Sequence, residues 1–165
     1  MGVNKVYFLL AKNPAWWAIG ARIIEKIEGI EFSHSAVMID NVVYESVWPK
    51  SRKMNFLEWS NHYKAKFIFG FDTTEENIEL VKMDCEEQMG KEYSIIQLIA
   101  IWLGIVFPFF NSWLEKRRWN GQKYLICTEL CSDIAFNHFE VGFTQELDNV
   151  DLTELKSALE KKVKW

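Results

Sequence analysis

Cysteine is scarce in this chain, and the pattern of its cysteines argues against two common structural roles. The sequence of 165 residues holds only 3 cysteines, at positions 85, 127 and 131. An odd number of thiols without a framework-like spacing does not indicate a set of disulfides. Cys127 and Cys131 also lack the further Cys or His ligands that a zinc site needs. The sequence therefore predicts reduced thiols in a cytoplasmic or cytosol-like reducing compartment.

Strong basic charge and targeting segments are also lacking. The net charge of −4 gives no sign of nucleic-acid binding. Residues 1–10 contain a short apolar run without the basic leader or cleavage site of a signal peptide, so they are expected to hold the first strand. No internal repeat and no long linker divides the sequence, which predicts a single domain over residues 1–165.

Short apolar runs predict the strands of a sheet. Asp40-Asn41 is a hairpin signal between two of these runs. Residues 49–53 read as a polar break, and residues 56–63 have no clear pattern. The predicted strands cover residues 6–10, 32–39, 42–47, 66–71 and 143–147.

Helical spacing and end signals predict the helices. Asn13-Pro14 is typical of a helix start, and Gly29 is typical of a helix end. Thr73 with Glu76 has the spacing of a capping box, and Asp151 is expected to cap the last helix. The predicted helices cover residues 13–29, 73–89, 128–139 and 151–164.

Cys127 stands where an apolar segment runs into a predicted helix. A thiol in a first helical turn meets unpaired backbone N–H groups and the positive end of the helix dipole, and both stabilise a thiolate. The same N–H groups are suited to hold an oxyanion. Cys131 lies one turn further along, beyond those groups, and is assigned to packing. The alternative for Cys127 is a purely structural role as a small buried hydrophobic residue, which is the commoner role of a free cysteine.

His34 is the candidate base, because it lies on a predicted strand beside the hairpin. If the turn at Asp40-Asn41 has an even number of residues, Ala36 faces Glu45, and Glu45 projects from the same face as His34. A carboxylate there can accept the ring N–H, fix the tautomer and favour the charged imidazole. A turn of odd length sends Glu45 to the opposite face, where it is an ordinary solvated residue.

The two other histidines are weaker candidates. His62 lies among polar residues of uncertain structure. His138 is predicted near the end of the helix that follows Cys127, roughly 16 Å further along its axis, so it does not easily reach that sulfur.

Four motifs follow one another along the chain in an order that resembles a known family. They are Ser33-His34-Ser35-Ala36-Val37, Tyr44-Glu45, Gly90-Lys91-Glu92-Tyr93 and Cys127-Thr128-Glu129-Leu130. The ordered set resembles the circularly permuted papain-like cysteine hydrolases, the YiiX/YaeF-like branch of the NlpC-type superfamily. In that family the histidine strand precedes the cysteine helix. The chain departs from the family pattern at Ser35, Ser94 and Thr128, and none of these changes removes a catalytic group.

The resemblance implies both a fold and a set of roles. The implied fold is α+β and papain-like (circularly permuted), with a small antiparallel β-sheet or barrel packed against helices. Cys127 is implied as nucleophile, His34 as base and Glu45 as orienting acid. Substrate binding is assigned to Tyr93, Ser33 and Thr128. The implied reaction is hydrolysis or acyl transfer at an amide or ester carbonyl of a peptide, amide or acyl-lipid substrate, without a metal or cofactor.

An alternative function depends on the apolar segment 95–110. This segment is slightly short for a membrane-spanning helix, and Pro108 interrupts its end. Trp102 and Trp113 suit a bilayer interface, and the basic side chains that follow suit anionic headgroups: Lys116, Arg117, Arg118 and Lys123. The alternative is thus a non-catalytic, membrane-associated or ligand-binding module. A buried core helix followed by a charged loop explains the segment more simply, and a hydrolase with peripheral membrane contact would combine both functions.

Overall fold

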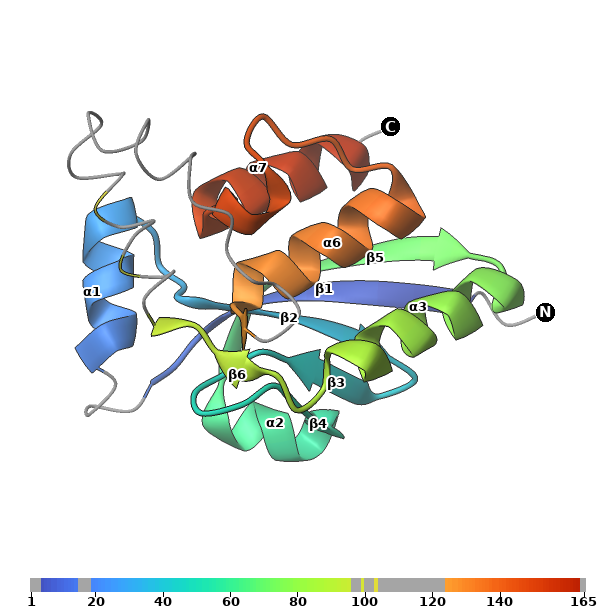
Figure 1. The fold of residues 1–165 in the computed structure, drawn as a ribbon, viewed down its shortest axis with the longest axis horizontal. Coiled ribbons are helices and arrows are strands. Elements are labelled where there is room, and N and C mark those ends of the chain that lie inside the picture. Colours follow the sequence, from blue (N-terminus) through green and yellow to red (C-terminus); the bar gives the residue numbers. More distant parts are fainter. Residues whose placement is uncertain (1–3, 15–18, 96–98, 100–102, 104–123, 164–165) are drawn as a thin grey trace.

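The computed structural model describes residues 4–14, 19–95, 99, 103 and 124–163 and has an α+β architecture. Its centre is an antiparallel sheet of five strands in the order β4-β3-β2-β1-β5 (Figure 1). The first strand in the chain therefore lies inside the sheet, between β2 and β5. The strands are β1 (Asn4–Lys12), β2 (His34–Ile39), β3 (Val42–Glu45), β4 (Arg52–Asn55) and β5 (Lys64–Thr73).

Helices cover both faces of this sheet. In Figure 1, α6 and α7 lie above the strands and α2 lies below them. A separate two-stranded parallel ladder pairs β6 (Glu92–Tyr93) with β7 (Tyr124–Leu125), directly before α6. The helices are α1 (Ile19–Glu28), α2 (Phe56–His62), α3 (Glu75–Gln88), α6 (Cys127–Phe139) and α7 (Leu152–Val163), with a short 3-10 helix at Leu147–Asn149.

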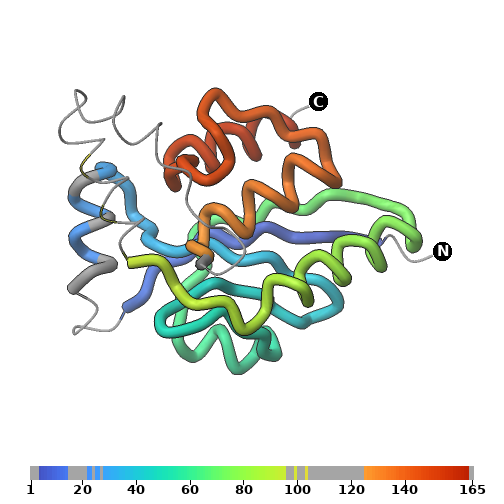
Figure 2. The backbone as a smooth tube through the Cα atoms, in the orientation of Figure 1, coloured from blue at the N-terminus to red at the C-terminus, as the bar shows by residue number. Residues whose placement is uncertain are grey.

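The backbone of β1 runs through the middle of the molecule (Figure 2). Its side chains alternate between the two faces of the sheet and supply apolar groups to both. Phe8 faces α6, where its ring packs edge-on against Phe139 with the centroids 5.9 Å apart. Leu9 faces the other way, into a smaller cluster that contains Trp59 of α2. A strand that is buried on both faces explains why residues 6–10 read as a continuous apolar run.

The hairpin between β2 and β3 forms as the sequence predicts. Asp40 and Asn41 both have positive φ, at 49° and 64°, which is the conformation of the two-residue turn favoured in hairpins. Ile39 pairs with Val42 and Met38 pairs with Val43. The turn therefore has an even number of residues, and the register directs the side chain of Glu45 to the same face as that of His34.

The predicted capping box at Thr73 and Glu76 is wrong by one residue. Thr74, not Thr73, is the N-cap of α3, and its side chain accepts a hydrogen bond from the backbone of Asn77. Thr73 is still part of β5, where it pairs with Asn4. The strand continues further than its apolar pattern indicates, which moves the helix start along the chain.

The predicted strand at 143–147 is also wrong. Thr144 and Gln145 donate their backbone N–H groups to the carboxylate of Glu154 instead of to a neighbouring strand. The polar break at 49–53 overlaps β4, an edge strand whose exposed side chains need no apolar alternation. The unassigned residues 56–63 form α2, capped by Asn55, whose side chain accepts from the backbone N–H of Leu57.

The apolar segment 95–110, on which the alternative function depends, lies outside the described residues apart from residues 95, 99 and 103. Trp102, Trp113 and the basic residues at 116–118 and 123 lie outside them as well, as do residues 15–18 after the predicted helix start at Asn13-Pro14. Among the residues that are described, no helix combines the length and apolar character needed to cross a membrane.

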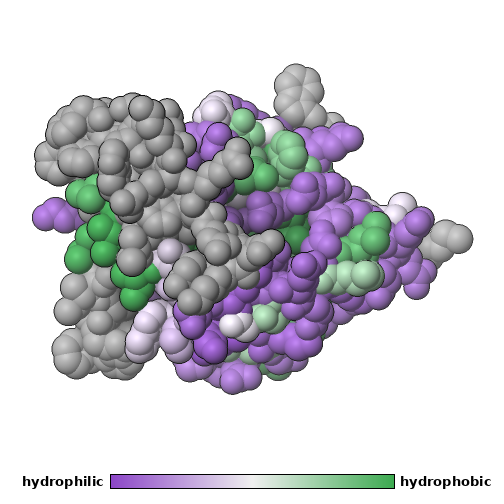
Figure 3. All heavy atoms as spheres, in the orientation of Figure 1, coloured by the Kyte–Doolittle hydropathy of each residue, from purple (hydrophilic) through white to green (hydrophobic). Residues whose placement is uncertain are grey.

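The surface around α3 is mainly hydrophilic in the view of Figure 3, with small apolar areas between the polar side chains. Exposed apolar residues on the helices include Leu80 and Met83 of α3 and Phe136 of α6. Isolated apolar side chains of this kind are normal on a folded protein and do not by themselves identify a docking face.

The capping residue of α3 can be tested by mutation. Thr74→Ala should lower the free energy of unfolding by about 1 kcal/mol, because it removes the acceptor for an N–H group of the first turn. Thr73→Ala should cost less, since it removes a part-buried hydrogen bond from the side chain of Asn77 and leaves the helix cap in place. Urea denaturation of the two variants measures the difference, and a larger loss for Thr73→Ala would contradict the assigned cap.

Candidate active site

Cys127 is the first residue of α6 and is 3% exposed. The chain reaches it through β7, whose parallel pairing with β6 fixes the approach to the helix. Ile126, the residue before the helix, carries no polar side chain with which to cap the first turn. The thiol therefore lies at the positive end of the helix, in the local setting that the sequence predicts.

His34 is the first residue of β2 and is 6% exposed. Its ring stacks on Tyr63, with the centroids 4.6 Å apart and the planes 18° from parallel. Tyr63 in turn stacks on Trp59, with the centroids 5.1 Å apart. This row of aromatic rings from the α2 side holds the imidazole in one plane.

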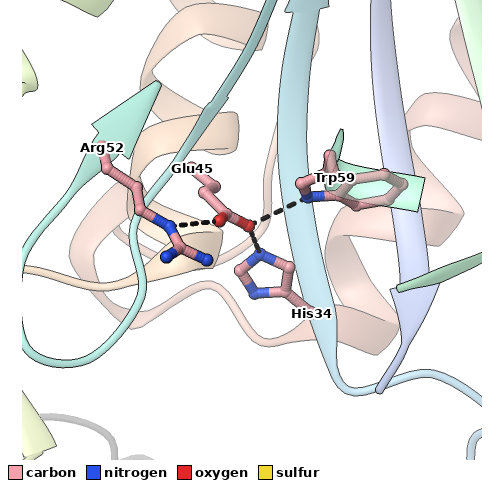
Figure 4. Close-up of polar contacts among 4 residues, drawn as sticks. All are labelled: His34, Glu45, Arg52 and Trp59. Carbon is pink, nitrogen blue, oxygen red and sulfur yellow. Dashed lines mark hydrogen bonds and ion pairs between the residues drawn. The ribbon is translucent and has the colours of Figure 1, made fainter. Parts of the chain in front are cut away.

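Glu45, at the end of β3, is fully buried at 0% exposed and accepts three hydrogen bonds (Figure 4). His34 Nε2 lies 2.7 Å from Glu45 Oε2, and the indole Nε1 of Trp59 donates to the same oxygen over 2.9 Å. Arg52 Nε donates to Oε1 over 2.8 Å. A buried charge needs partners of this kind, and here both carboxylate oxygens are occupied.

These partners keep Glu45 ionised. Burial alone would raise the pKa of the carboxyl, but the hydrogen bonds and positive charges of His34 and Arg52 outweigh it and lower the pKa to about 2. Because an ionised carboxylate only accepts hydrogen bonds, the Nε2 atom of His34 carries a proton. The other ring nitrogen, Nδ1, is then the one that remains for the thiol.

Cys127 and His34 shift each other's titration. Burial raises the pKa of the thiol, but the hydrogen bond and charge of His34, with further help from Ser35, bring that pKa below its usual value. Burial also lowers the pKa of His34, yet Tyr63, Cys127 and Glu45 together raise it well above its usual value. The two shifts favour a thiolate beside an imidazolium, the reactive form of a cysteine nucleophile.

Tyr93, in β6, is the third group in contact with the sulfur. Its hydroxyl lies within hydrogen-bond reach of Cys127. Burial and the neighbouring sulfur raise the pKa of the phenol well above its usual range, so the hydroxyl stays protonated. It is therefore a neutral potential donor close to the sulfur of Cys127.

Cys131 has a different environment from Cys127. It is fully buried in the next turn of α6, and burial raises its pKa, which keeps it a thiol. Cys85, in α3, is likewise buried with a raised pKa. Neither thiol has the combination of a helix start and an imidazole partner that Cys127 has.

Ser33 and Thr128, the other two expected substrate-binding residues, flank His34 and Cys127 in the sequence and are both buried. The hydroxyl of Ser33 donates to Glu25 Oε1 over 3.3 Å, which ties the start of β2 to α1. Thr128 lies in the first turn of α6. Their contact with a substrate stays a prediction.

The two weaker histidine candidates lie elsewhere. His62 is exposed at the end of α2. His138 joins α6 to α3: its Nε2 atom lies 2.7 Å from Asp84 Oδ2, and its Nδ1 atom lies 3.1 Å from Asn77 Oδ1. Of the three histidines, His34 is the one whose charge and hydrogen bond lower the pKa of Cys127.

Sequence reasoning missed several residues that surround His34 and Glu45. Arg52 lies on an edge strand within the supposed polar break, and Trp59 lies in the helix that had no clear pattern. Tyr63 follows that helix. Only the aromatic spacing of residues 56, 59 and 63, which stack in a row, offered a signal. Arg52 gave none, because an exposed arginine on a short strand resembles any surface residue.

Glu28, at the end of α1, was also missed. Thr153 Oγ1 donates to Glu28 Oε2 over 3.5 Å, and the backbone N–H groups of Leu152 and Thr153 at the start of α7 contact the same carboxyl. Burial, Asp151 and the charge of Cys127 raise the pKa of Glu28 to about 8, although the backbone N–H groups of Leu152 and Thr153 act to lower it. A second carboxyl group thus lies within electrostatic range of the thiol, on the side of α1 and α7.

Comparisons with known proteins add no family to this description. No protein-family model matches the chain, and no curated protein matches it either. The chemistry proposed below therefore depends on the residues and contacts of this chain itself.

The raised pKa of Glu28 gives a pH-dependent prediction. Between pH 4.5, its ordinary pKa, and about 8, the folded protein keeps a proton that the unfolded chain releases. This group therefore lowers the free energy of unfolding as the pH rises through that window. Glu28→Gln has no such titration, so its stability relative to the wild type should increase from pH 4.5 to 8 and then level off.

Urea denaturation of both proteins at several pH values between 4.5 and 9 measures this difference. Glu31→Gln removes one negative charge from a solvent-exposed residue nearby and is the matched control. A stability difference for Glu28→Gln that stays constant with pH would refute the raised pKa.

Proposed function

We propose that this chain is a cysteine hydrolase that cleaves an amide or ester bond through a thioacyl intermediate. Cys127 is the nucleophile, His34 is the acid and base, and Glu45 orients the imidazole. The observation that carries the proposal is the position of His34, whose ring contacts the sulfur of Cys127 and the buried carboxylate of Glu45 together. A thiol, an imidazole and a carboxylate in this order are the parts of a catalytic triad.

In the first half of the reaction, the Cys127 thiolate attacks the carbonyl carbon of the substrate. A carbon–sulfur bond forms, and the electron pair of the carbonyl moves to its oxygen. When that pair returns, the bond to the leaving group breaks, and the His34 imidazolium gives its Nδ1 proton to the departing amine or alcohol. The product of this half is a thioester on Cys127 and a neutral imidazole.

In the second half, water or another acceptor attacks the thioester. His34 takes a proton from the acceptor as the new bond to carbon forms. The tetrahedral intermediate then expels the thiolate, which leaves Cys127 and His34 as they began. Glu45 remains ionised throughout, because its low pKa and its three donors keep a proton from settling on it.

Two donors are suited to hold the oxyanion. One is the backbone N–H of Cys127 at the start of α6. The other is the Tyr93 hydroxyl, which stays protonated and lies within hydrogen-bond reach of the sulfur. Donors fixed before the reaction need no rearrangement as the negative charge develops, which makes them effective stabilisers of the transition state.

The chain order supports a circularly permuted papain-like arrangement as the finer description of the fold. His34 and Glu45 come from the sheet early in the chain, and Cys127 comes from a later helix that packs on β2. The three cysteines, all within the described residues, are free. Free thiols support a reducing, cytosol-like compartment, and the substrate classes proposed are peptides, amides and acyl lipids.

The identity of the nucleophile can be tested with a thiol-reactive acyl ester such as p-nitrophenyl acetate. Cys127→Ala should abolish the acetyl adduct and the burst of p-nitrophenolate, because no other thiol has an imidazole partner. Cys131→Ala should keep both. Intact-protein mass spectrometry and stopped-flow absorbance measure the two signals.

The matched pair of cysteine variants also shows which outcome refutes the assignment. An adduct retained in Cys127→Ala and lost in Cys131→Ala would move the nucleophile to the second thiol. Far-ultraviolet circular dichroism of both variants controls for folding, since Cys131 is the more deeply buried of the two side chains.

The role of Tyr93 can be separated from general damage by comparing two reactions of Cys127. Acylation by p-nitrophenyl acetate passes through an oxyanion, whereas alkylation by iodoacetamide does not. Tyr93→Phe should slow acylation by about a hundredfold at a pH where the thiolate is fully formed. Alkylation at the same pH should change little, and an equal loss in both reactions would remove Tyr93 from the oxyanion site.

A further inference from the structure

Ser35 is a fully buried serine with an unusual hydroxyl. It is 0% exposed, and among the described residues its Oγ atom finds no hydrogen-bond partner of ordinary geometry. Ser132 of α6, a serine of comparable burial, donates to the carbonyl oxygens of Glu129 and Leu147. A buried hydroxyl without such a bond costs stability, so its presence calls for an explanation.

The position of Ser35 in the sheet explains why its hydroxyl is buried without an ordinary hydrogen bond. It follows His34 in β2, so the two side chains point to opposite faces of the sheet. The face of Ser35 packs against α6, where its hydroxyl lies beside the sulfurs of Cys127 and Cys131. The backbone N–H of Ser35 also contacts Cys127.

We propose that Ser35 is a positioning residue whose hydroxyl and backbone N–H hold Cys127 in its thiolate form. This inference rests on the proposed function, because it assigns a role toward the same nucleophile. A neutral thiol is a poor hydrogen-bond acceptor, whereas a thiolate is charged and accepts strongly. The Ser35 hydroxyl lacks an ordinary hydrogen bond while Cys127 is a neutral thiol, and it gains one when the sulfur is negative.

Cys131 completes this arrangement. Burial raises the pKa of Cys131, so it remains protonated while Cys127 ionises. The Cys131 S–H group can then donate to Ser35 Oγ and leave the hydroxyl proton for Cys127. The second thiol of the helix thereby directs the serine toward the first.

The other ionisable groups around Cys127 belong to different elements and set the background for any measurement. His34 of β2 favours the thiolate, while Glu28 of α1 lies within range and carries a charge of the same sign only above its raised pKa of about 8. Tyr93 of β6 and Tyr63 after α2 also interact with the sulfur. Ser35 is the neutral donor on the α6 side, so its removal changes no charge in this set.

The test is the pH dependence of Cys127 alkylation by iodoacetamide, followed by peptide mass mapping so that each cysteine is counted separately. Ser35→Ala should raise the midpoint of the Cys127 profile by about one pH unit. At a fixed pH below both midpoints, alkylation should then be about tenfold slower. Ser35→Thr keeps a hydroxyl and should restore most of the wild-type profile.

Ser132→Ala is the matched control, because it removes a buried serine of α6 that makes two ordinary hydrogen bonds. It should lower the free energy of unfolding in urea and leave the alkylation midpoint unchanged. Ser35→Ala should keep the wild-type free energy of unfolding and should raise the midpoint of Cys127 alkylation. This crossed result separates a role toward the thiolate from a role in packing.

Each remaining outcome decides the matter. A low midpoint in the wild type that Ser35→Ala leaves unchanged would overturn the inference about Ser35 and spare the proposed hydrolase. A wild-type midpoint at the ordinary value for cysteine, about 8.5, would overturn the activated thiolate and the role of Ser35 together. If Ser35→Ala does not fold, Ser35→Thr decides the question alone. An alkylation midpoint above the wild-type value in this variant, which keeps the hydroxyl, would reduce Ser35 to a packing role.

Discussion

The rest of the site depends on the hydrogen bonds that hold the buried carboxylate of Glu45. A charge taken out of water is costly unless several donors surround it, and Trp59, Arg52 and His34 supply them. The result is a row of alternating charge from Arg52 through Glu45 and His34 to the sulfur of Cys127. Each member favours the ionised form of the next. The carboxylate of Glu45 helps to raise the pKa of His34, and the charged imidazole in turn lowers the pKa of Cys127.

A single strand connects this row to the opposite side of the sheet. β2 directs His34 toward the aromatic cluster of α2 and directs Ser35 toward α6. Cys127 lies at the start of α6, where it meets contacts from both residues. The alternation of a β-strand thus gives two consecutive residues access to one sulfur from different directions, which neither a helix nor a loop offers as rigidly.

The sequence was sufficient for the parts of the site that local rules control. Asp40-Asn41 indicated the hairpin, and a turn with an even number of residues, as the structure has, places Glu45 on the face of His34. The helix start at Cys127 followed from the residues around it. Arg52 and Trp59 were not predictable, because their importance arises from contacts across strands and helices. Local patterns describe a residue's own backbone, whereas these partnerships depend on packing between distant segments.

The spacing of the site along the chain has a consequence for its assembly during synthesis. The imidazole of His34, the carboxylate of Glu45 and the side chains around them all lie between residues 34 and 63, whereas the sulfur belongs to residue 127. Because the ribosome makes the N-terminal part first, the imidazole and its support can emerge well before the thiol exists. Cys127 therefore gains its imidazole partner only when α6 docks against β2, and a chain interrupted before that point lacks the paired thiol and imidazole.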